Sequence, residues 1–515
     1  MNMPQWLKDA VFYEIYPPSF QDSDGDGIGD LQGIISRLDY IKDLGCNALW
    51  LNPCFDSPFR DGGYDIRDYK KVAPRYGTND DLIGLFHEAH RRGIRVLLDL
   101  VPGHTSDTHP WFIESSRYEP NEYSGRYIWT DHPFTGIGGH PYISGMTERY
   151  GAYMLNFFAS QPALNYGWLH RTEKWMSAVD SPEAIATKEA MKDIMRFWLE
   201  KGCDGFRVDM ADSLVKNDDE NKSATAAIWR DVRNMLDREY PEAAMVSEWN
   251  NPVQAVNAGG FHMDFYLDWG WCANGYNTLL RDYEMGQEDR SYFRRDGHGD
   301  IHRFLDEYLP RYEAVKDRGY ISLFTCNHDT PRAARTLDTD ELKTAWAMIL
   351  TMPGVPFVYY GDEIGMRFLD VRSKEGGYHR TGSRTPMQWD DTANYGFSTA
   401  EKDRLYLPVD PAEDAPTVQA QKDDPDSLYN TVKEVIRLRH ENPDLQADGP
   451  FEVLIAEGTD FVYRRGSLIV AMNPSAETSV LHHPSFAGKK ILYRIKDVQL
   501  ADALILPPSS FVILK

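Results

Sequence analysis

Short apolar runs recur along the chain up to residue 360, and stretches with helical periodicity lie between them. The runs are four to six residues long and rich in Val, Ile, Leu and Tyr, a pattern typical of buried strands. Strands that alternate with helices form a parallel sheet, and eight of them close into a (β/α)8, or TIM, barrel. The eight predicted strands span residues 11–16, 48–52, 96–101, 205–209, 244–248, 262–265, 321–326 and 355–360.

Two stretches interrupt this alternation. Residues 105–166, after the third strand, are rich in Gly, Tyr and Pro, and they are too long for a plain loop in a compact domain, so they predict a small inserted domain. After residue 410 a Pro- and Asp-rich segment leads to a predicted helix and then to short alternating runs, typical of an antiparallel β-sandwich. The predicted α/β fold comprises a barrel (1–104 and 167–410), an inserted domain (105–166) and a C-terminal domain (411–515) whose helix spans 427–442.

The composition limits the partners and the location of the protein. A net charge of -24 at pH 7 argues against nucleic acid and anionic membranes as partners. The aromatic content of 13% suits a sugar-binding protein, because aromatic faces stack on pyranose rings. The five scattered cysteines form no CxxC pair, and the first residues lack the features of a signal peptide. No run approaches the length of a membrane span, so we expect a cytoplasmic protein.

Three carboxylates stand at or just beyond the ends of predicted strands. Asp209 ends the segment GFRVD, Glu248 ends MVSE, and Asp329 ends NHD after the seventh strand. Catalytic sites of TIM barrels lie at the carboxyl ends of the strands, so we expect these three side chains to lie close together. Arg207 precedes Asp209 by two residues and shares its face of the strand, where it favours the ionised carboxylate. A structural ion pair is the alternative for an Arg-x-Asp segment taken alone.

These segments resemble those of the α-amylase superfamily, glycoside hydrolase family 13. The resemblance begins with AVFYEIYPPSF at residue 10 and continues in order through DSDGDGIGDLQGI, NPCFDSPFRDGGYDIRDY, DLVPGHTSDTHPWF, GFRVD, SEW, NHD and GVPFVYYGDEIGM. It ends with SRTPMQWDD and LPVDP near residue 408. Within the superfamily the chain is most similar to the α-glucosidase, oligo-1,6-glucosidase and trehalose synthase group, which shares the phrases GYDI, QPxLN and RTPMQW.

The resemblance implies a role for each of the three carboxylates. Asp209 is the implied nucleophile that forms a β-glucosyl enzyme, Glu248 the implied acid and base, and Asp329 the implied stabiliser of the transition state. A retaining reaction needs one ionised and one protonated carboxyl group on opposite sides of the bond. Arg207 should keep Asp209 ionised, whereas burial beside Trp249 and the neighbouring negative charges should keep Glu248 protonated.

The resemblance also implies a subsite for a terminal glucose unit. Tyr64 is similar to the aromatic platform of that subsite, and His104 and His328 are similar to its donors to sugar hydroxyls. Asp65 and Arg380 match a pair that binds the terminal glucose and blocks the pocket behind it. With Arg207, these are the predicted substrate-binding residues, and a blocked pocket would make the enzyme exo-acting.

The segment after the first strand carries carboxylates at alternate positions. With its interspersed glycines it suits a hard cation that takes oxygen ligands. It begins like an EF-hand, but the twelfth position is Gly33 rather than Glu, so we reject an EF-hand. The resemblance implies structural Ca²⁺ in this loop; Mg²⁺ and a solvated acidic turn are the alternatives. The predicted ligands are Asp22, Asp24, Asp26, Asp30 and the backbone carbonyl of Ile28.

The leading interpretation is a retaining, exo-acting α-glucosidase-like hydrolase of short α-glucosides, with a disaccharide or small oligosaccharide as its partner. A transglycosylase or isomerase of the trehalose synthase type uses the same carboxylates and is the first alternative. An amylase-like endo-hydrolase with an open cleft is the second. A non-enzymatic role is a third alternative, because some members of the superfamily are transporter subunits that have lost the catalytic carboxylates. This chain retains all three carboxylates, which argues against that alternative. Met210, which follows the implied nucleophile, leaves the linkage preference open. The sequence also leaves the oligomeric state open.

Overall fold

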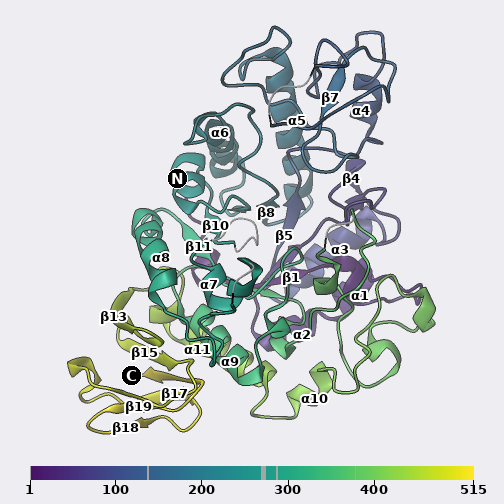
Figure 1. Ribbon diagram of the computed structural model, residues 1–515. Coiled ribbons are helices and arrows are strands. Elements are labelled where there is room, and N and C mark those ends of the chain that lie inside the picture. Colours follow the sequence, from purple (N-terminus) through teal and green to yellow (C-terminus); the bar gives the residue numbers. More distant parts are fainter. Residues whose placement is uncertain (1, 136–138, 268–273, 286–287, 377–378) are drawn as a thin grey trace.

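A closed parallel sheet forms the centre of the protein (Figure 1). The computed structural model describes residues 2–135, 139–267, 274–285, 288–376 and 379–515. The sheet has eight strands in the order β11-β10-β9-β8-β5-β2-β1-β12, and a bridge between Phe324 and Phe357 joins its two edges. The predicted TIM barrel is therefore confirmed. Its strands are β1 (Phe12–Ile15), β2 (Ala48–Leu51), β5 (Arg95–Leu100), β8 (Gly205–Val208), β9 (Ala244–Ser247), β10 (Met263–Phe265), β11 (Tyr320–Ser322) and β12 (Phe357–Tyr359).

The barrel strands are apolar on both faces because both faces are buried. Alternate residues such as Phe12, Trp50 and Phe357 pack together inside the barrel, and the rings of Phe12 and Phe357 stack 4.4 Å apart. The residues between them, such as Tyr13 and Leu49, pack outward against the helices. This period of two decides which side chains reach the inside of the barrel at the ends of the strands.

Helices cover the outside of the barrel (Figure 1). Two of them start with a capping box, in which Thr78 or Asp338 exchanges hydrogen bonds with the residue three positions on. The stretch after β9 contains a π-helical segment, Val253–Gly259. The α-helices around the barrel are α1 (Leu31–Ser36), α2 (Leu38–Leu44), α3 (Asn79–Arg91), α5 (Pro182–Leu199), α6 (Ser223–Glu239), α7 (Asn277–Leu280), α8 (His302–Val315) and α9 (Thr339–Thr351).

Outside residues 136–138, which the structure does not describe, the long segment between β5 and α5 contains one short helix, α4 (Pro110–Ser115), and one strand pair, β6 (Tyr142–Ser144) with β7 (Ala152–Met154). Another pair, β3 (Phe55–Asp56) with β4 (Asp68–Val72), follows β2. The inserted segment has a small apolar cluster of its own. That cluster reaches beyond residue 166, because it consists of Ile128, Met154, Ala163, Trp168 and Met176.

The C-terminal part forms two antiparallel sheets that face each other across an apolar layer, as predicted. The predicted helix before them is α11 (Leu428–Glu441), preceded by α10 (Val418–Lys422). The larger sheet has the order β13-β14-β15-β20-β17 and the smaller β16-β19-β18. These strands are β13 (Glu452–Glu457), β14 (Asp460–Arg465), β15 (Leu468–Asn473), β16 (Ser479–Leu481), β17 (Ile491–Ile495), β18 (Gln499–Leu500), β19 (Leu504–Leu506) and β20 (Ser510–Leu514).

Four of the five cysteines are buried free thiols: Cys46, Cys54, Cys203 and Cys326. Cys272 lies outside the described residues. In the part of the chain that the structure describes, no helix combines the length and the apolar character that crossing a bilayer requires.

Candidate active site

A cavity of about 490 Å³ lies at the carboxyl ends of the barrel strands. Asp209, Glu248 and Asp329 all line it, so the structure brings together the three carboxylates that the sequence singled out. The wall around them contains aromatic, amide and charged groups. Further lining residues are Asp61, Tyr64, His104, Phe157, Met210, Asp212, Trp249, Asn250, Asn251, Gln254, Leu267 and Arg380.

The period of two in the strands explains how charged residues reach this cavity. Val246 points into the barrel, so Glu248, two residues on, points the same way just beyond β9. The same step leads from Leu97 to Asp99 on β5 and from Phe12 to Glu14 on β1. The buried carboxylates of Asp99 and Glu14 were not among the predicted site residues. Their signal was available, since each interrupts an apolar strand with a charge.

Arg207 connects the carboxylates at the base of the cavity. Its side chain is 1% exposed, and its Nη1 lies 2.9 Å from Asp209 Oδ1 and 3.0 Å from Asp99 Oδ1. Its Nη2 lies 2.9 Å from Glu248 Oε2. Arg207 therefore holds the side chains of Asp209 and Glu248 in fixed positions from below, rather than lining the cavity itself.

Burial and the neighbouring charges give the two central carboxyl groups different pKa values. It raises the pKa of Glu248 to about 8; Asp209 and Asp329 add to the rise, and Arg207 opposes it. Burial also raises the pKa of Asp209, but Arg207 limits that pKa to about 6. Near neutral pH, Glu248 is thus largely protonated and Asp209 largely ionised, the division that a retaining glycosidase requires.

The backbone after Asp209 also touches Glu248. The N–H of Met210 donates to Glu248 Oε2 at 2.9 Å, and Met210 has a left-handed conformation with φ of 41°. Non-glycine residues with positive φ are uncommon and cluster at functional sites. Oε2 thus accepts from both Met210 and Arg207, which leaves Oε1 to carry the proton.

Asp329 is held in its ionised form by three cations. Burial alone would raise its pKa, but His328, Arg380 and Arg384 hold the pKa well below its usual range. Its Oδ1 lies 2.6 Å from Arg380 Nη1 and 2.8 Å from Arg384 Nη2, and its Oδ2 lies 3.2 Å from His328 Nε2. Arg384 in turn pairs with the buried Glu375, which anchors the loop that carries both arginines.

His328 lies beneath the cavity, against Tyr64. Its ring is fully buried and stacks on the Tyr64 ring at 5.3 Å, and its Nε2 is 2.7 Å from the Tyr64 hydroxyl. Its Nδ1 is 2.8 Å from Glu14 Oε1. Burial opposes a positive charge, but Asp329 and Glu14 raise the pKa of His328 to about 9. The structure therefore places His328 as a buried cation that supports Tyr64 and Asp329.

His104 lies on the cavity wall, as predicted, and is neutral. Burial lowers the pKa of His104 to about 3. Its Nε2 is 3.2 Å from the carbonyl oxygen of Tyr64, and its Nδ1 is 3.1 Å from Nδ2 of Asn156. Asn156 belongs to the inserted segment, so that segment helps to position a side chain of the cavity.

The prediction that Asp65 acts together with Arg380 is wrong for Asp65. The Asp65 carboxylate accepts hydrogen bonds from Ser57 Oγ and from the backbone N–H groups of Arg60 and Asp61, so it shapes the local turn. Asp61 pairs with Arg380 instead, and Gln161 Nε2 donates to Asp61 Oδ2 at 2.6 Å.

The sequence carried a signal for Asp61 in the two glycines that follow it. Gly62 and Gly63 have φ of 57° and 104°, which turns the chain so that Asp61 and Tyr64 both face the cavity. A Cβ on Gly62 would lie 2.8 Å from the Tyr16 hydroxyl and from Arg384 Nη1, so the site has no room for a side chain there. The motif GYDI alone indicated Asp65, which lies four residues after the correct residue, Asp61.

The acidic loop after β1 brings together three of its four carboxylates. One oxygen from each of Asp22, Asp24 and Asp30 lies within 4.8 Å of the others. Asp26 is not in this group, and its Oδ1 accepts from the backbone N–H of Ile28. Asp30 also caps α1 through the N–H of Gly33. The oxygen donor set fits a hard cation such as Ca²⁺.

The site combines a TIM barrel, a cavity at the ends of its strands, and one protonated and one ionised carboxyl group. This combination defines an enzyme that acts on glycosidic bonds. The alpha-amylase catalytic-domain family matches residues 14–448. The chain belongs to this family.

The chain is also similar to characterised enzymes and to solved structures. Trehalose synthase/amylase TreS of Mycobacterium tuberculosis is 35% identical, over 88% of this chain and 78% of its own length. Oligo-1,6-glucosidase of Heyndrickxia coagulans is 31% identical, over 96% of this chain and 97% of its own length. A mutant isomaltulose synthase from Erwinia rhapontici, solved with sucrose, superposes with a TM-score of 0.81 at 26% identity and covers 99% of both chains.

Proposed function

We propose that the protein is a retaining, exo-acting α-glucosidase-like hydrolase of short α-glucosides. The observation that carries this proposal is the ion pair of Asp61 with Arg380, which lies at the cavity wall beside Asp329. Asp61 and Arg380 are 2% and 5% exposed, and in this proposal the pair closes the inner end of the cavity instead of leaving an open cleft.

In this proposal Asp209 attacks the anomeric carbon while Glu248 protonates the leaving oxygen from Oε1. The β-glucosyl enzyme then reacts with water, which Glu248 activates as a base, and the α configuration is restored. Asp329 and Arg380 bind hydroxyl groups of the glucose unit, and Tyr64 supplies the ring on which that unit packs. The supporting observation is the divided protonation of Asp209 and Glu248.

A closed inner end predicts cleavage from the non-reducing end. Maltoheptaose should release single glucose units, and short α-glucosides should be better substrates than polymeric starch. Arg380→Ala should lower kcat/KM by an amount that corresponds to about 2–4 kcal/mol of lost transition-state stabilisation. The reason is that a buried charge-assisted contact is lost and Asp61 is left without its ion-pair partner. Chromatography of the products and steady-state kinetics measure both effects.

The matched control is Arg60→Ala, which removes a neighbouring ion pair at the surface: Arg60 Nη1 lies 2.8 Å from Asp107 and its side chain is 48% exposed. This variant should keep kcat/KM within a few-fold of the unmodified enzyme. Maltotriose and maltotetraose as the main products of maltoheptaose would contradict the closed pocket and indicate an amylase-like cleft.

Intramolecular transfer is the second candidate, because the relatives include a trehalose synthase/amylase and an isomaltulose synthase. The leaving-group side of the cavity supports it. Asn250 and Asn251 offer amide groups that suit a second hexose retained between the two steps. Product chromatography from maltose, trehalose, sucrose and isomaltose separates the two candidates, since isomerisation yields a second disaccharide and hydrolysis yields only monosaccharides.

The divided pKa values predict a bell-shaped pH profile. Asp209 must be ionised, so kcat/KM should rise as the pH passes about 6, the pKa of Asp209. Glu248 must be protonated, so kcat/KM should fall as the pH passes about 8, the pKa of Glu248. Initial rates between pH 4.5 and about 9.5 test this, and a flat profile over that interval would contradict the assignment.

We also propose that Asp22, Asp24 and Asp30 hold a structural cation, Ca²⁺ or Mg²⁺, with the carbonyl of Ile28 as a further ligand. A chelator should then lower Tm, because a ligand at 100 times its Kd stabilises the folded state by about 2.7 kcal/mol. Asp24→Ala should reproduce this loss, and Asp26→Ala, outside the cluster, should not. Metal analysis that finds no cation in active protein of equal stability would contradict the proposal.

A further inference from the structure

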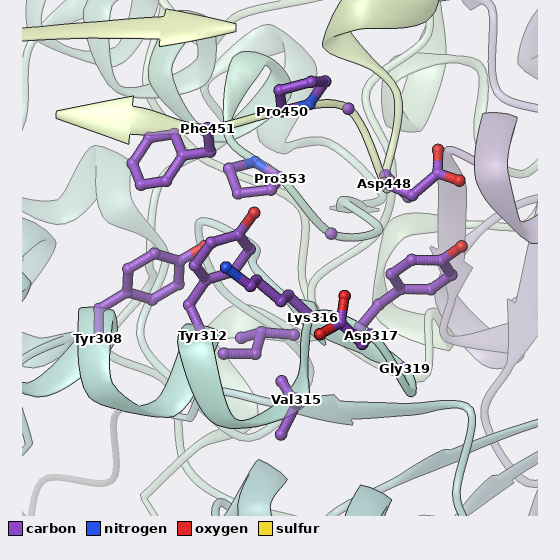
Figure 2. A pocket seen from close by; sticks show the side chains of 15 residues that line it. Tyr308, Tyr312, Val315, Lys316, Asp317, Gly319, Pro353, Asp448, Pro450 and Phe451 are labelled. Carbon is purple, nitrogen blue, oxygen red and sulfur yellow. The ribbon is translucent and has the colours of Figure 1, made fainter. Parts of the chain in front are cut away.

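Ion pairs occur both at the surface of the protein and behind its catalytic cavity. Figure 2 shows a cavity of about 280 Å³ where the C-terminal end of α8 meets the segment 447–451. Two charged residues of its lining are paired: Lys316 Nζ lies 2.5 Å from Glu313 Oε2, and Asp448 Oδ2 lies 2.6 Å from Lys8 Nζ. Both pairs are exposed, and exposed pairs contribute little. The ion pairs behind the catalytic cavity are instead buried and connected to one another.

Five side chains behind the catalytic cavity form a chain of alternating charges, in the order Asp61, Arg380, Asp329, Arg384 and Glu375. Both arginines contact the same oxygen of Asp329, Oδ1, at 2.6 Å and 2.8 Å. Two cations that share one oxygen repel each other, and a second carboxylate on each relieves this repulsion. For Arg380 this carboxylate is Asp61. For Arg384 it is Glu375, at 2.5 Å.

Glu375 lies in the loop that follows β12, and its side chain is fully buried. Its Oε2 accepts from Arg384 Nη1, and its Oε1 accepts from the hydroxyl groups of Tyr16 at 2.5 Å and Tyr406 at 2.7 Å. Burial alone would raise the pKa of Glu375, but Arg384 and the two hydroxyl groups hold that pKa below its usual range. Glu375 is therefore an ionised carboxylate, and all three contacts are charge-assisted.

The partners of Glu375 come from separate parts of the chain. Tyr16 directly follows β1. Tyr406 precedes the C-terminal part, and its backbone N–H donates to the carbonyl of Gly27 at 3.0 Å. Glu375 is not among the described residues that line the catalytic cavity, so it can act on a bound sugar only through a partner. Arg384, which contacts Asp329 directly, is the partner that reaches the cavity wall.

We propose that Glu375 is a positioning residue for the terminal-glucose subsite. Its charge holds Arg384 against Asp329, and Arg380 then keeps its place beside Asp61. With a neutral residue at position 375, Arg384 would keep only Asp329 as an ion-pair partner among the described residues, and it would compete there with Arg380. Asp329 and Arg380 would then shift from the glucose hydroxyl groups. The inference rests on the proposed function, in which those two residues bind the glucose unit.

Glu375→Gln tests the charge alone. Glutamine has the same shape, and it can still accept from Arg384 through its oxygen and donate to the two tyrosine hydroxyls through its NH₂ group. KM for maltose and Ki for glucose as a competitive inhibitor should each rise about tenfold, since a charge-assisted contact is lost. A partly unfolded sample would lower kcat and leave both constants unchanged, so KM and Ki separate positioning from a loss of folded protein.

Tyr406→Phe is the second variant, because it removes one hydroxyl group from a half-buried side chain and stays interpretable if Glu375→Gln does not fold. It should raise KM and Ki by about threefold. Arg372→Ala, at an exposed residue of the same loop, is the matched control and should change neither constant.

Unchanged KM and Ki in Glu375→Gln, or in Tyr406→Phe where Glu375→Gln does not fold, would overturn the proposal. An equal rise in Arg372→Ala would assign the effect to the loop as a whole and would overturn it as well. The products of the unmodified enzyme test the proposed function, whereas the ratio of each variant's constants to those of the unmodified enzyme tests Glu375. The two proposals can therefore fail separately.

Discussion

Asp209→Asn is expected to lower kcat by about 10⁴-fold or more, since an amide cannot form the glucosyl ester on which both steps depend. The fold should survive this change. Arg207 keeps Asp99 and Glu248 as partners, and the new side chain has the same shape as the old one. Rates with maltose, together with Tm from circular dichroism, measure activity and stability in the same samples.

The neighbouring carboxylate at Asp212 provides a matched control, because it lines the same cavity but has no part in the proposed chemistry. Asp212→Asn should stay within about tenfold of the unmodified kcat. Removing the nucleophile altogether sharpens the test. Azide should restore activity to Asp209→Gly and give β-glucosyl azide, because azide attacks from the face that Asp209 occupied. Near-normal turnover by Asp209→Asn would refute the assignment.

Glu248→Gln is expected to have the second largest effect, about 10³-fold or more on natural disaccharides, because no group then protonates the leaving oxygen. A substrate with an activated leaving group, such as a dinitrophenyl glucoside, needs little protonation and should lose far less in the first step. Deglycosylation still lacks its base, so the glucosyl enzyme should accumulate. A burst of dinitrophenol followed by slow turnover measures this.

The stereochemistry of azide products distinguishes the two roles. Glu248→Ala with azide should give α-glucosyl azide, because azide then intercepts the β-glucosyl enzyme, whereas Asp209→Gly should give the β anomer. The same anomer from both variants would mean that Asp209 and Glu248 do not divide the reaction as proposed. The upper limb of the pH profile should also disappear in Glu248→Gln.

Local pattern was sufficient for the barrel and for the positions of its strand-end carboxylates, whereas the roles of those carboxylates came from the family resemblance. The apolar runs are near-continuous because barrel strands are buried on both faces, so all eight were recognisable without any tertiary information. The period of two then required Asp209 to share a face with Arg207, and the ion pair of 2.9 Å follows from that register. Glu248 was found for the same reason, as the charge that ends a buried strand.

Contacts between distant segments were decided only by the tertiary structure. Asp61 meets Arg380 across 319 residues, and although two glycines mark a turn after Asp61, nothing local shows that this turn meets Arg380. The difference is one of direction: the turn at Gly62 and Gly63 leaves Asp61 facing the cavity, while Asp65 bonds to backbone N–H groups.

The protonation states likewise depend on what folding places around each group. The sequence identified Arg207 as the partner of Asp209, but burial, which raises the pKa of Asp209 to about 6 and that of Glu248 to about 8, arises only when the barrel closes. Asp329 behaves oppositely because Arg380 and Arg384, from a loop about fifty residues further along the chain, join its neighbour His328 around the carboxylate. Sequence thus determined the strands and the carboxylates at their ends, because periodicity is local. The pocket and its charges needed the fold, because electrostatic environment is set by neighbours in space.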